Sequence, residues 1–147
     1  MTLENIAEIL NGQENLYSID AATIKNWAEE GGKELAKAKV TRGYFLTIVS
    51  QIDRVVNQCK SAKAKGEEAN YDSLVFTEPH IGYQASRQKG DAKPALLGLQ
   101  KLLDNGLRKI STEHLIPDLT RLNQLFQAMA AYFQANRNPE SEENDHE

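Results

Sequence analysis

Apolar residues recur at spacings of three and four along most of the chain, which is the period of an α-helix with one buried face. The clearest run lies between residues 41 and 60. Its apolar members are Phe45, Ile48, Val49, Ile52, Val55, Val56 and Cys59. The run is rich in β-branched residues, but a strand would need alternation in steps of two, and that alternation is absent. The pattern therefore predicts a helix with Thr41 as its N-cap.

Two further helices are predicted in the C-terminal half, because long apolar seams of this kind pack against other helices. The first carries Leu96, Leu99, Leu103, Leu107 and Ile110. The second carries Leu115, Leu119, Leu122, Phe126, Met129 and Phe133. Both seams are predicted to be buried.

The N-terminal part predicts two shorter helices. The first has one apolar face and ends at Asn11-Gly12; the face consists of Leu3, Ile6, Ile9 and Leu10. The second begins near Ser18 or Asp20, either of which can accept hydrogen bonds from free helix N–H groups. Gly31-Gly32 is predicted to break or kink this second helix.

Between these regions, residues 61–73 are predicted to form a polar connection, and a short helix is expected to follow Pro79 and to end near Gly90. No strand and no internal repeat is predicted. The fold class is therefore all-α, a compact bundle of five or six helices in a single domain over residues 1–136. Residues 137–147 contain no apolar side chain and are expected to form a disordered acidic tail.

Charge is distributed unevenly along the chain. The net charge is −4, but residues 33–109 hold 14 Lys and Arg against 8 Asp and Glu, while the flanks are acidic. A basic middle of this kind can form a local positive surface on an acidic protein. The alternative is that these charges scatter over solvated helix faces.

Signals of catalysis, metal binding or cofactor binding are absent from the sequence. There is no phosphate-binding glycine loop, and His80, His114 and His146 are far apart. Cys59 lies on an apolar face and is interpreted as a core residue rather than a nucleophile. The chain also lacks an apolar run long enough to span a membrane and lacks a signal-peptide pattern at its start. A non-enzymatic, cytoplasmic protein without metal or cofactor is expected.

The segment TEPHIGYQASRQKGDAK, residues 77–93, carries the most informative chemistry. On a helix, His80, Tyr83 and Arg87 share one face, with Ile81 and Ala85 free to face inward. Arg can hold phosphate through two N–H groups, and Tyr or His can stack or bond a ribose hydroxyl, so this stripe suits RNA. The alternative is structural, with a half-buried Tyr83 and the Arg87 stem packed over it.

This segment resembles the form LKPKLAYAAGR that is common in small subunits of the type III-A (Csm) CRISPR interference complex. It keeps Pro79, Tyr83 and Arg87, with small residues between them. The segment FQAMAAYFQ, residues 126–134, is similar to the family's last helix, which often reads FEAIVAYHK. The predicted helix near 41–56 also looks like a family helix that begins with Thr or Ser and a basic residue. The resemblance covers roughly residues 40–135.

The resemblance implies a helical bundle that stacks in several copies along the effector filament and lines the groove that holds the guide RNA–target RNA duplex. It implies no RNA cleavage. The implied role is to brace the duplex and to help the complex register complementarity in antiviral defence. The implied partners are guide RNA, target RNA, other Csm-complex subunits and further copies of the chain.

Because every target sequence differs, such a role requires contacts to phosphate rather than to bases. The candidate RNA-binding residues are Lys37, Lys39, Arg42, Arg54, Lys60, His80, Tyr83, Arg87, Lys89 and Lys93. If the group at residues 37–42 converges with the group at residues 87–93, Arg42 and Arg87 are expected to contribute together to RNA binding. Two rival classes remain, a helical protein–protein adaptor without an RNA role and a small DNA-binding regulator. The second ranks behind the first because no helix-turn-helix is evident.

Overall fold

The computed structural model describes residues 1–137, and all the regular secondary structure in this part of the chain is helical. The helices are α1 (Leu3–Asn11), α2 (Ala21–Lys37), α3 (Arg42–Ala64), α4 (Asp72–Ser86), α5 (Ala92–Arg108) and α6 (Leu115–Asn136). The predicted all-α, single-domain bundle of five or six helices is confirmed. No described helix combines the length and the apolar character needed to cross a membrane. Apart from Arg137, the predicted acidic tail lies outside the described residues.

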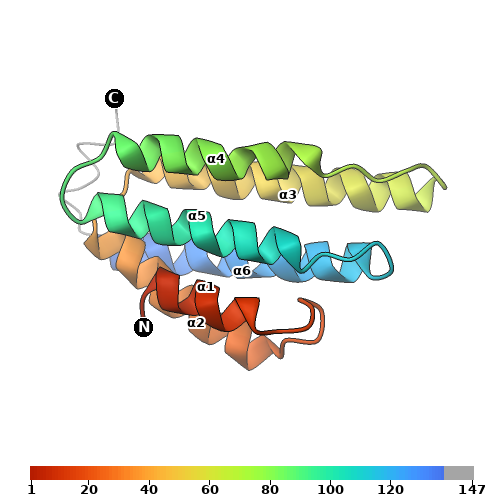
Figure 1. Ribbon diagram of the computed structural model, residues 1–147, viewed down its shortest axis with the longest axis horizontal. Helices are drawn as coiled ribbons and strands as arrows, with labels where there is room; N and C mark the ends of the chain where they lie inside the picture. Colours follow the sequence, from red (N-terminus) through yellow and green to blue (C-terminus); the bar gives the residue numbers. More distant parts are fainter. Residues whose placement is uncertain (138–147) are drawn as a thin grey trace.

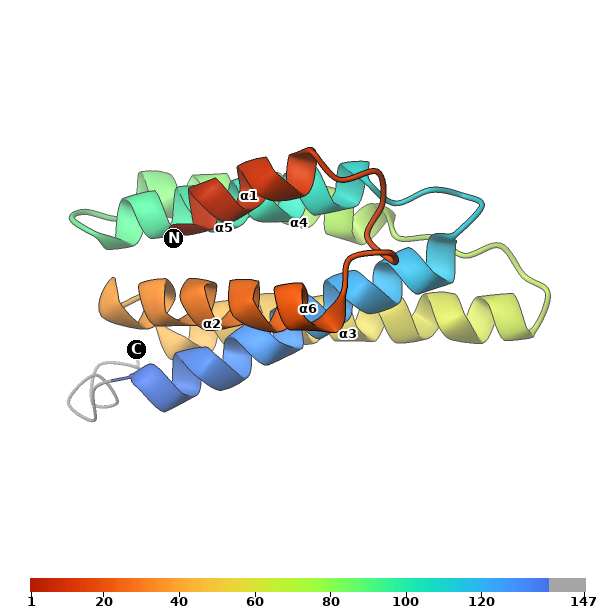
Figure 2. The same ribbon diagram turned by 90° about the horizontal axis from the view of Figure 1, so that it is seen from below.

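These helices form two layers of three. In one layer α5 lies between α1 and α4, and in the other α6 lies between α2 and α3 (Figures 1 and 2). The core fills the space between the layers, where Phe45 of α3 and Phe133 of α6 meet edge to face with ring centroids 5.0 Å apart. Helices α3 and α4 therefore face each other along one long edge of the two-layer bundle.

Chain reversals gather at the two ends of the bundle. The α2–α3 and α4–α5 connections lie at one end, where α6 also finishes (Figures 1 and 2). The α1–α2, α3–α4 and α5–α6 connections lie at the other end. Segments that are far apart in sequence are thus brought together at each end.

Helix α4 begins earlier than predicted. It spans Asp72–Ser86, so the prediction of a short helix that starts after Pro79 and ends near Gly90 is wrong. Pro79 removes the N–H that would bond the carbonyl of Val75, but both residues lie on the exposed side of the helix, where water can replace it. The opposite side is anchored in the core by Leu74, Thr77, Ile81 and Ala85.

The glycine pair of α2 does not break or kink the helix, contrary to prediction, because α2 continues to Lys37. Both glycines are buried, and their role is close packing. A Cβ atom on Gly31 would lie 2.8 Å from Leu3 Cδ2, and one on Gly32 would lie 2.8 Å from the carbonyl oxygen of Met129. The missing side chains therefore let α2 approach α1 and α6 closely.

Helix α3 continues into the stretch that was expected to be a polar connection, and only residues 65–71 link it to α4. Its end is fixed by Gly66, which has φ 72°. The N–H of Gly66 donates to the carbonyl of Lys63 at 3.1 Å, and the N–H of Glu67 donates to that of Ala62 at 2.8 Å. This pair of bonds is a Schellman motif. At the other end Thr41 is the N-cap, as predicted, but its side chain makes no capping bond.

The predicted core seams are largely confirmed. All six predicted residues of α6 are buried, as are Leu96, Leu99 and Leu103 of α5. Leu107 and Ile110 are only partly buried, because α5 ends at Arg108 and they lie at the rim of the bundle.

Of the two N-caps considered for α2, the chain uses Asp20, whose carboxylate accepts from the N–H of Thr23 at 2.7 Å.

A buried carboxylate holds together the end of the bundle where the α1–α2, α3–α4 and α5–α6 connections lie. Sequence reasoning did not single out this residue. Asp118 is fully buried in the first turn of α6. Its Oδ1 accepts from the N–H groups of Leu16 and Tyr17 at 3.2 and 3.0 Å, and its Oδ2 accepts from the N–H of Ser111 at 3.1 Å. One side chain thus ties the α1–α2 connection to the α5–α6 connection.

Candidate nucleic-acid interface

An exposed stripe of imidazole, phenol and guanidinium groups runs along α4. The rings of His80 and Tyr83 have centroids 6.3 Å apart, and the guanidinium carbon of Arg87 lies 5.7 Å from the Tyr83 ring centroid. Ile81 and Ala85 are fully buried on the other side, so the predicted division of faces is confirmed. Tyr83 is 57% exposed and Arg87 lies over its ring, so the RNA-binding and the structural interpretation of this pair both stay predictions.

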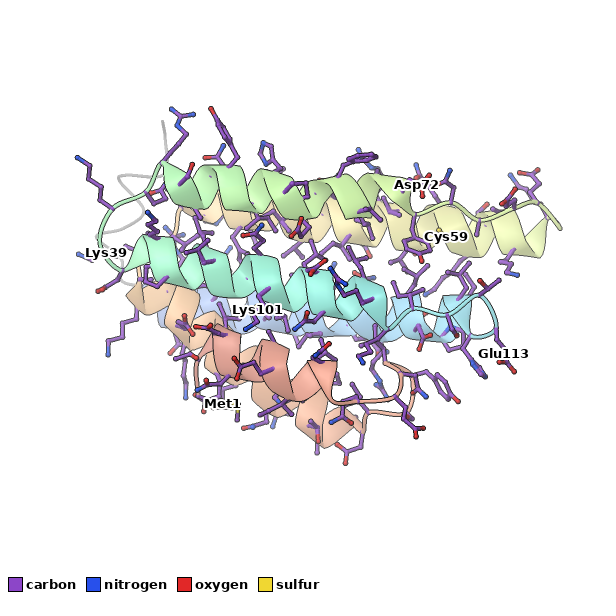
Figure 3. The ribbon with its side chains drawn as sticks, in the orientation of Figure 1. Met1, Lys39, Cys59, Asp72, Lys101 and Glu113 are labelled. Carbon is purple, nitrogen blue, oxygen red and sulfur yellow. The ribbon has the colours of Figure 1, made fainter. Side chains whose placement is uncertain are left out.

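Six exposed basic residues from two separate connections gather at one end of the bundle, which we call the basic end. They are Lys37, Lys39, Arg42, Arg87, Lys89 and Lys93. The two connections meet, because Thr41 from the first and Gln88 and Ala92 from the second line one small hollow of about 70 Å³. Figure 3 labels Lys39 at this end. The two groups therefore do converge, a point that the sequence left open.

Lys39 holds an unusual backbone conformation at the basic end. Its φ is 61°, the only positive φ of a non-glycine residue in residues 1–137. The N–H of Lys39 donates to Ala36 and that of Val40 donates to Leu35, which closes α2 with a Schellman motif. Glycine is preferred at this position, and a larger residue there costs roughly 1 kcal/mol. The chain nevertheless carries a cation at this site.

Two predicted residues, Arg54 and Lys60, lie away from the basic end. Both are exposed on α3, twelve and eighteen residues after Arg42. With a rise of 1.5 Å per residue, they stand about 18 and about 27 Å further along the helix axis. They belong to the long α3–α4 edge of the bundle and stand apart from the basic end.

Sequence reasoning missed a groove between α3 and α4. It has a volume of about 420 Å³ and is lined by Tyr44, Thr47, Ile48, Gln51, Ser73, Phe76, Thr77 and His80. Phe76 is 74% exposed and precedes His80 by one helical turn, so it extends the stripe on α4. The spacing of four could have revealed Phe76, but the prediction of a helix start at Pro79 excluded it.

Tyr44 is the most constrained member of this groove. Its hydroxyl oxygen is buried and has no hydrogen-bond partner among residues 1–137, and burial raises the pKa of Tyr44 to about 12. The Tyr44 ring lies 6.1 Å from that of His80, which brings the two helices into contact across the groove. A second open hollow of about 400 Å³ adjoins on α3 and is lined by Leu46, Thr47, Ser50, Gln51 and Arg54.

The remaining chemically notable residues have structural surroundings. Cys59 is 1% exposed, and burial raises the pKa of its thiol, in keeping with its interpretation as a core residue. His114 stacks on Tyr17 with ring centroids 4.4 Å apart, and His146 lies outside the described residues. Within residues 1–137, no three His, Cys, Asp or Glu side chains are grouped so that they could hold a metal ion.

Comparisons with curated proteins and with solved structures gave no significant match. A family model described as Csm2 Type III-A matches residues 18–138. The matched region includes α2 to α6, and with them the stripe on α4, the groove and the whole basic end. The match covers most of the chain and agrees with the resemblance found in its motifs. The chain therefore belongs to the Csm2 Type III-A family, and is a small subunit of the type III-A CRISPR complex.

Proposed function

We propose that this subunit binds the guide RNA–target RNA duplex through phosphate contacts and braces it while complementarity is monitored, without catalysing a reaction. The observation that carries the proposal is the basic end, where exposed cations from two distant parts of the sequence converge. Contacts of Lys and Arg to phosphate are independent of sequence, as every new target requires. An A-form duplex also favours recognition of shape and phosphate over bases.

The remaining predicted residues extend this surface. His80 and Tyr83 continue it along α4, and Arg54 and Lys60 continue it along α3. In this proposal the partners are guide RNA, target RNA and further copies of the chain, in addition to the other Csm subunits. The strained backbone of Lys39 supports the proposal, because a residue kept against its conformational preference is more readily explained by function than by stability.

The first prediction concerns Arg42 and Arg87. Replacing both with Ala should weaken binding of two unrelated RNA duplexes equally, by roughly tenfold, because each loses phosphate contacts and no base contact. The slope of log affinity against log salt should fall by up to about two. Fluorescence anisotropy in a salt series measures both quantities. A thermal melt should shift little, since exposed arginines each contribute within about 0.5 kcal/mol.

The matched control is Lys25→Ala, which removes one exposed cation from the part of α2 that lies away from the basic end. This control should leave RNA binding close to that of the unchanged protein. If Arg87→Ala lowers the melting temperature and leaves RNA affinity untouched, the arginine has a structural role and the proposal loses its support at that residue.

A helical adaptor without an RNA role is the second candidate function. It is favoured by Val75 and Phe76, which are 47% and 74% exposed, since apolar groups of this size on a surface often mark a protein contact. The basic middle of the chain would then meet an acidic partner. In that case the variants at Arg42 and Arg87 would lose copurification with other Csm subunits while RNA affinity stays unchanged.

A further inference from the structure

We infer that the groove between α3 and α4 holds a single unpaired nucleobase of the RNA whose phosphates contact the basic end. The inference rests on the proposed function, since it names a second element of the same ligand. It concerns residues that the phosphate contacts leave unused, namely the exposed Phe76 and the groove beside it.

The groove offers an aromatic surface on which a base can stack. Phe76 is 74% exposed, so most of its ring is open to a ligand. His80 and Tyr44 stand beside it, with their own rings 6.1 Å apart. Stacking on an aromatic side chain tolerates every base, because every base has a π-face. A volume of about 420 Å³ lies within the usual range for a small-ligand site.

The groove also offers polar groups that the protein itself does not use. The Tyr44 hydroxyl is buried without a partner in the described part of the chain, which is unfavourable unless a ligand supplies one. The side-chain amide of Gln51, which is half-buried, makes no hydrogen bond within residues 1–137. Base edges carry donors and acceptors side by side, as do a hydroxyl and an amide. The polar groups thus match the edge of a base while Phe76 matches its face.

Charge and continuity favour a nucleotide over a protein side chain. Among the described residues that line the groove, none carries a carboxylate. Arg54 lies in the adjoining hollow, which shares Thr47 and Gln51 with the groove, and Arg87 lies on the same stripe as Phe76. A phosphate beside a captured base would therefore lie near Arg54, and Arg87 would meet a phosphate about 16 Å further along α4. A stable protein interface buries about 800 Å² per partner around an apolar centre, whereas the large exposed apolar residues of α4 are only Val75, Phe76 and Tyr83.

The test uses RNA duplexes that carry one unpaired 2-aminopurine, one abasic residue at the same place, or no unpaired position. The protein should bind the 2-aminopurine duplex at least about fivefold more tightly than the abasic one, and should quench its fluorescence by stacking. Phe76→Ala and Phe76→Leu should abolish both the preference and the quenching, and Phe76→Tyr should retain them. Val75→Ala, at the neighbouring exposed position, is the matched control and should change neither.

The outcomes separate this inference from the proposed function. Unchanged fluorescence on binding, with the effect of Arg87→Ala intact for all three duplexes, would overturn the nucleobase site and leave phosphate binding in place. Failure to bind any of the duplexes would overturn both. If Phe76→Ala leaves the RNA preference unchanged but weakens association with other Csm subunits or with further copies of the chain, the groove is a protein contact and the inference is wrong.

Discussion

At the scale of single residues, backbone stability and the proposed RNA binding favour different residues at position 39. The left-handed backbone of this residue closes α2, and the following Val40 is buried against the core. A glycine would meet both conditions with less strain. Lysine supplies a positive charge beside the α4–α5 connection, so the two requirements on this position point in opposite directions.

The second prediction is that Lys39→Gly stabilises the protein and weakens its binding to RNA. Relief of the positive φ should raise the free energy of unfolding by up to about 1 kcal/mol, which is a rise of a few degrees in Tm. Loss of the cation should weaken RNA affinity by roughly threefold. Thermal melts and anisotropy on the same preparations measure the two effects.

Lys37→Ala is the control, because it removes a neighbouring exposed cation from a helical position. It should lower RNA affinity to a similar extent and leave Tm nearly unchanged. A fall in Tm for Lys39→Gly would show that the Lys39 side chain makes a stabilising contact that outweighs the strain of its backbone, and would contradict the prediction.

At the scale of helices, the close approach of α2 to α6 depends on two missing side chains. A Cβ on Gly32 would lie 2.7 Å from Tyr132 Cβ and 2.8 Å from two backbone atoms of α6. Backbone atoms of a packed helix cannot move aside as the end of a flexible side chain can. The glycine therefore fixes the spacing within the layer that also contains α3.

The third prediction compares two glycines. Alanine normally stabilises a helix interior relative to glycine by about 1 kcal/mol. At Gly32 the clash with α6 should outweigh that gain, so Gly32→Ala should lower the unfolding free energy by about 1–2 kcal/mol. Gly43→Ala in α3, where a Cβ would meet no described atom within 4 Å beyond the local helix backbone, should instead be neutral or stabilising. Chemical denaturation of both variants tests the contrast, and equal effects would refute it.

The helices that sequence reasoning placed well are those whose period alone decides the structure, such as α6. It placed α4 and the end of α2 badly, because Pro79 and Gly31-Gly32 are local breaking signals that tertiary packing overrides. The shared face of Tyr83 and Arg87 followed from spacing. The groove did not, because it depends on Tyr44 and Phe76 from two helices whose relative placement has no local signal.

At the scale of the whole molecule, a net charge of −4 coexists with a basic end. Residues 138–147 hold five Asp and Glu and no Lys or Arg, so they account for the acidity of the chain. Without them the net charge would be +1, since −4 plus 5 is +1. The electrostatic potential of the whole chain changes the rate and affinity with which a polyanion such as RNA binds.

The fourth prediction is that removing residues 138–147 strengthens RNA binding several-fold at low salt, because repulsion of phosphate is lost. The gain should fade as salt rises toward 1 M, where the screening length is about 3 Å. A variant of 147 residues with these five carboxylates changed to amides should behave like the truncated one in stopped-flow and equilibrium binding measurements across the salt series. If the amide variant binds like the unchanged chain, charge is not the cause.

The length of α3 also provides a site for attaching a spectroscopic label far from the basic end. Its 23 residues place the exposed Glu67 and Glu68 roughly 34 Å from the helix start at Arg42. The chain has one cysteine, Cys59, which is buried and whose thiol pKa is raised. A dye attached after Glu68→Cys would therefore be site-specific without removal of the native thiol. It would leave the Schellman bond of the Glu67 N–H intact, and energy transfer between such dyes, far from the basic end, would test whether copies of the chain lie side by side.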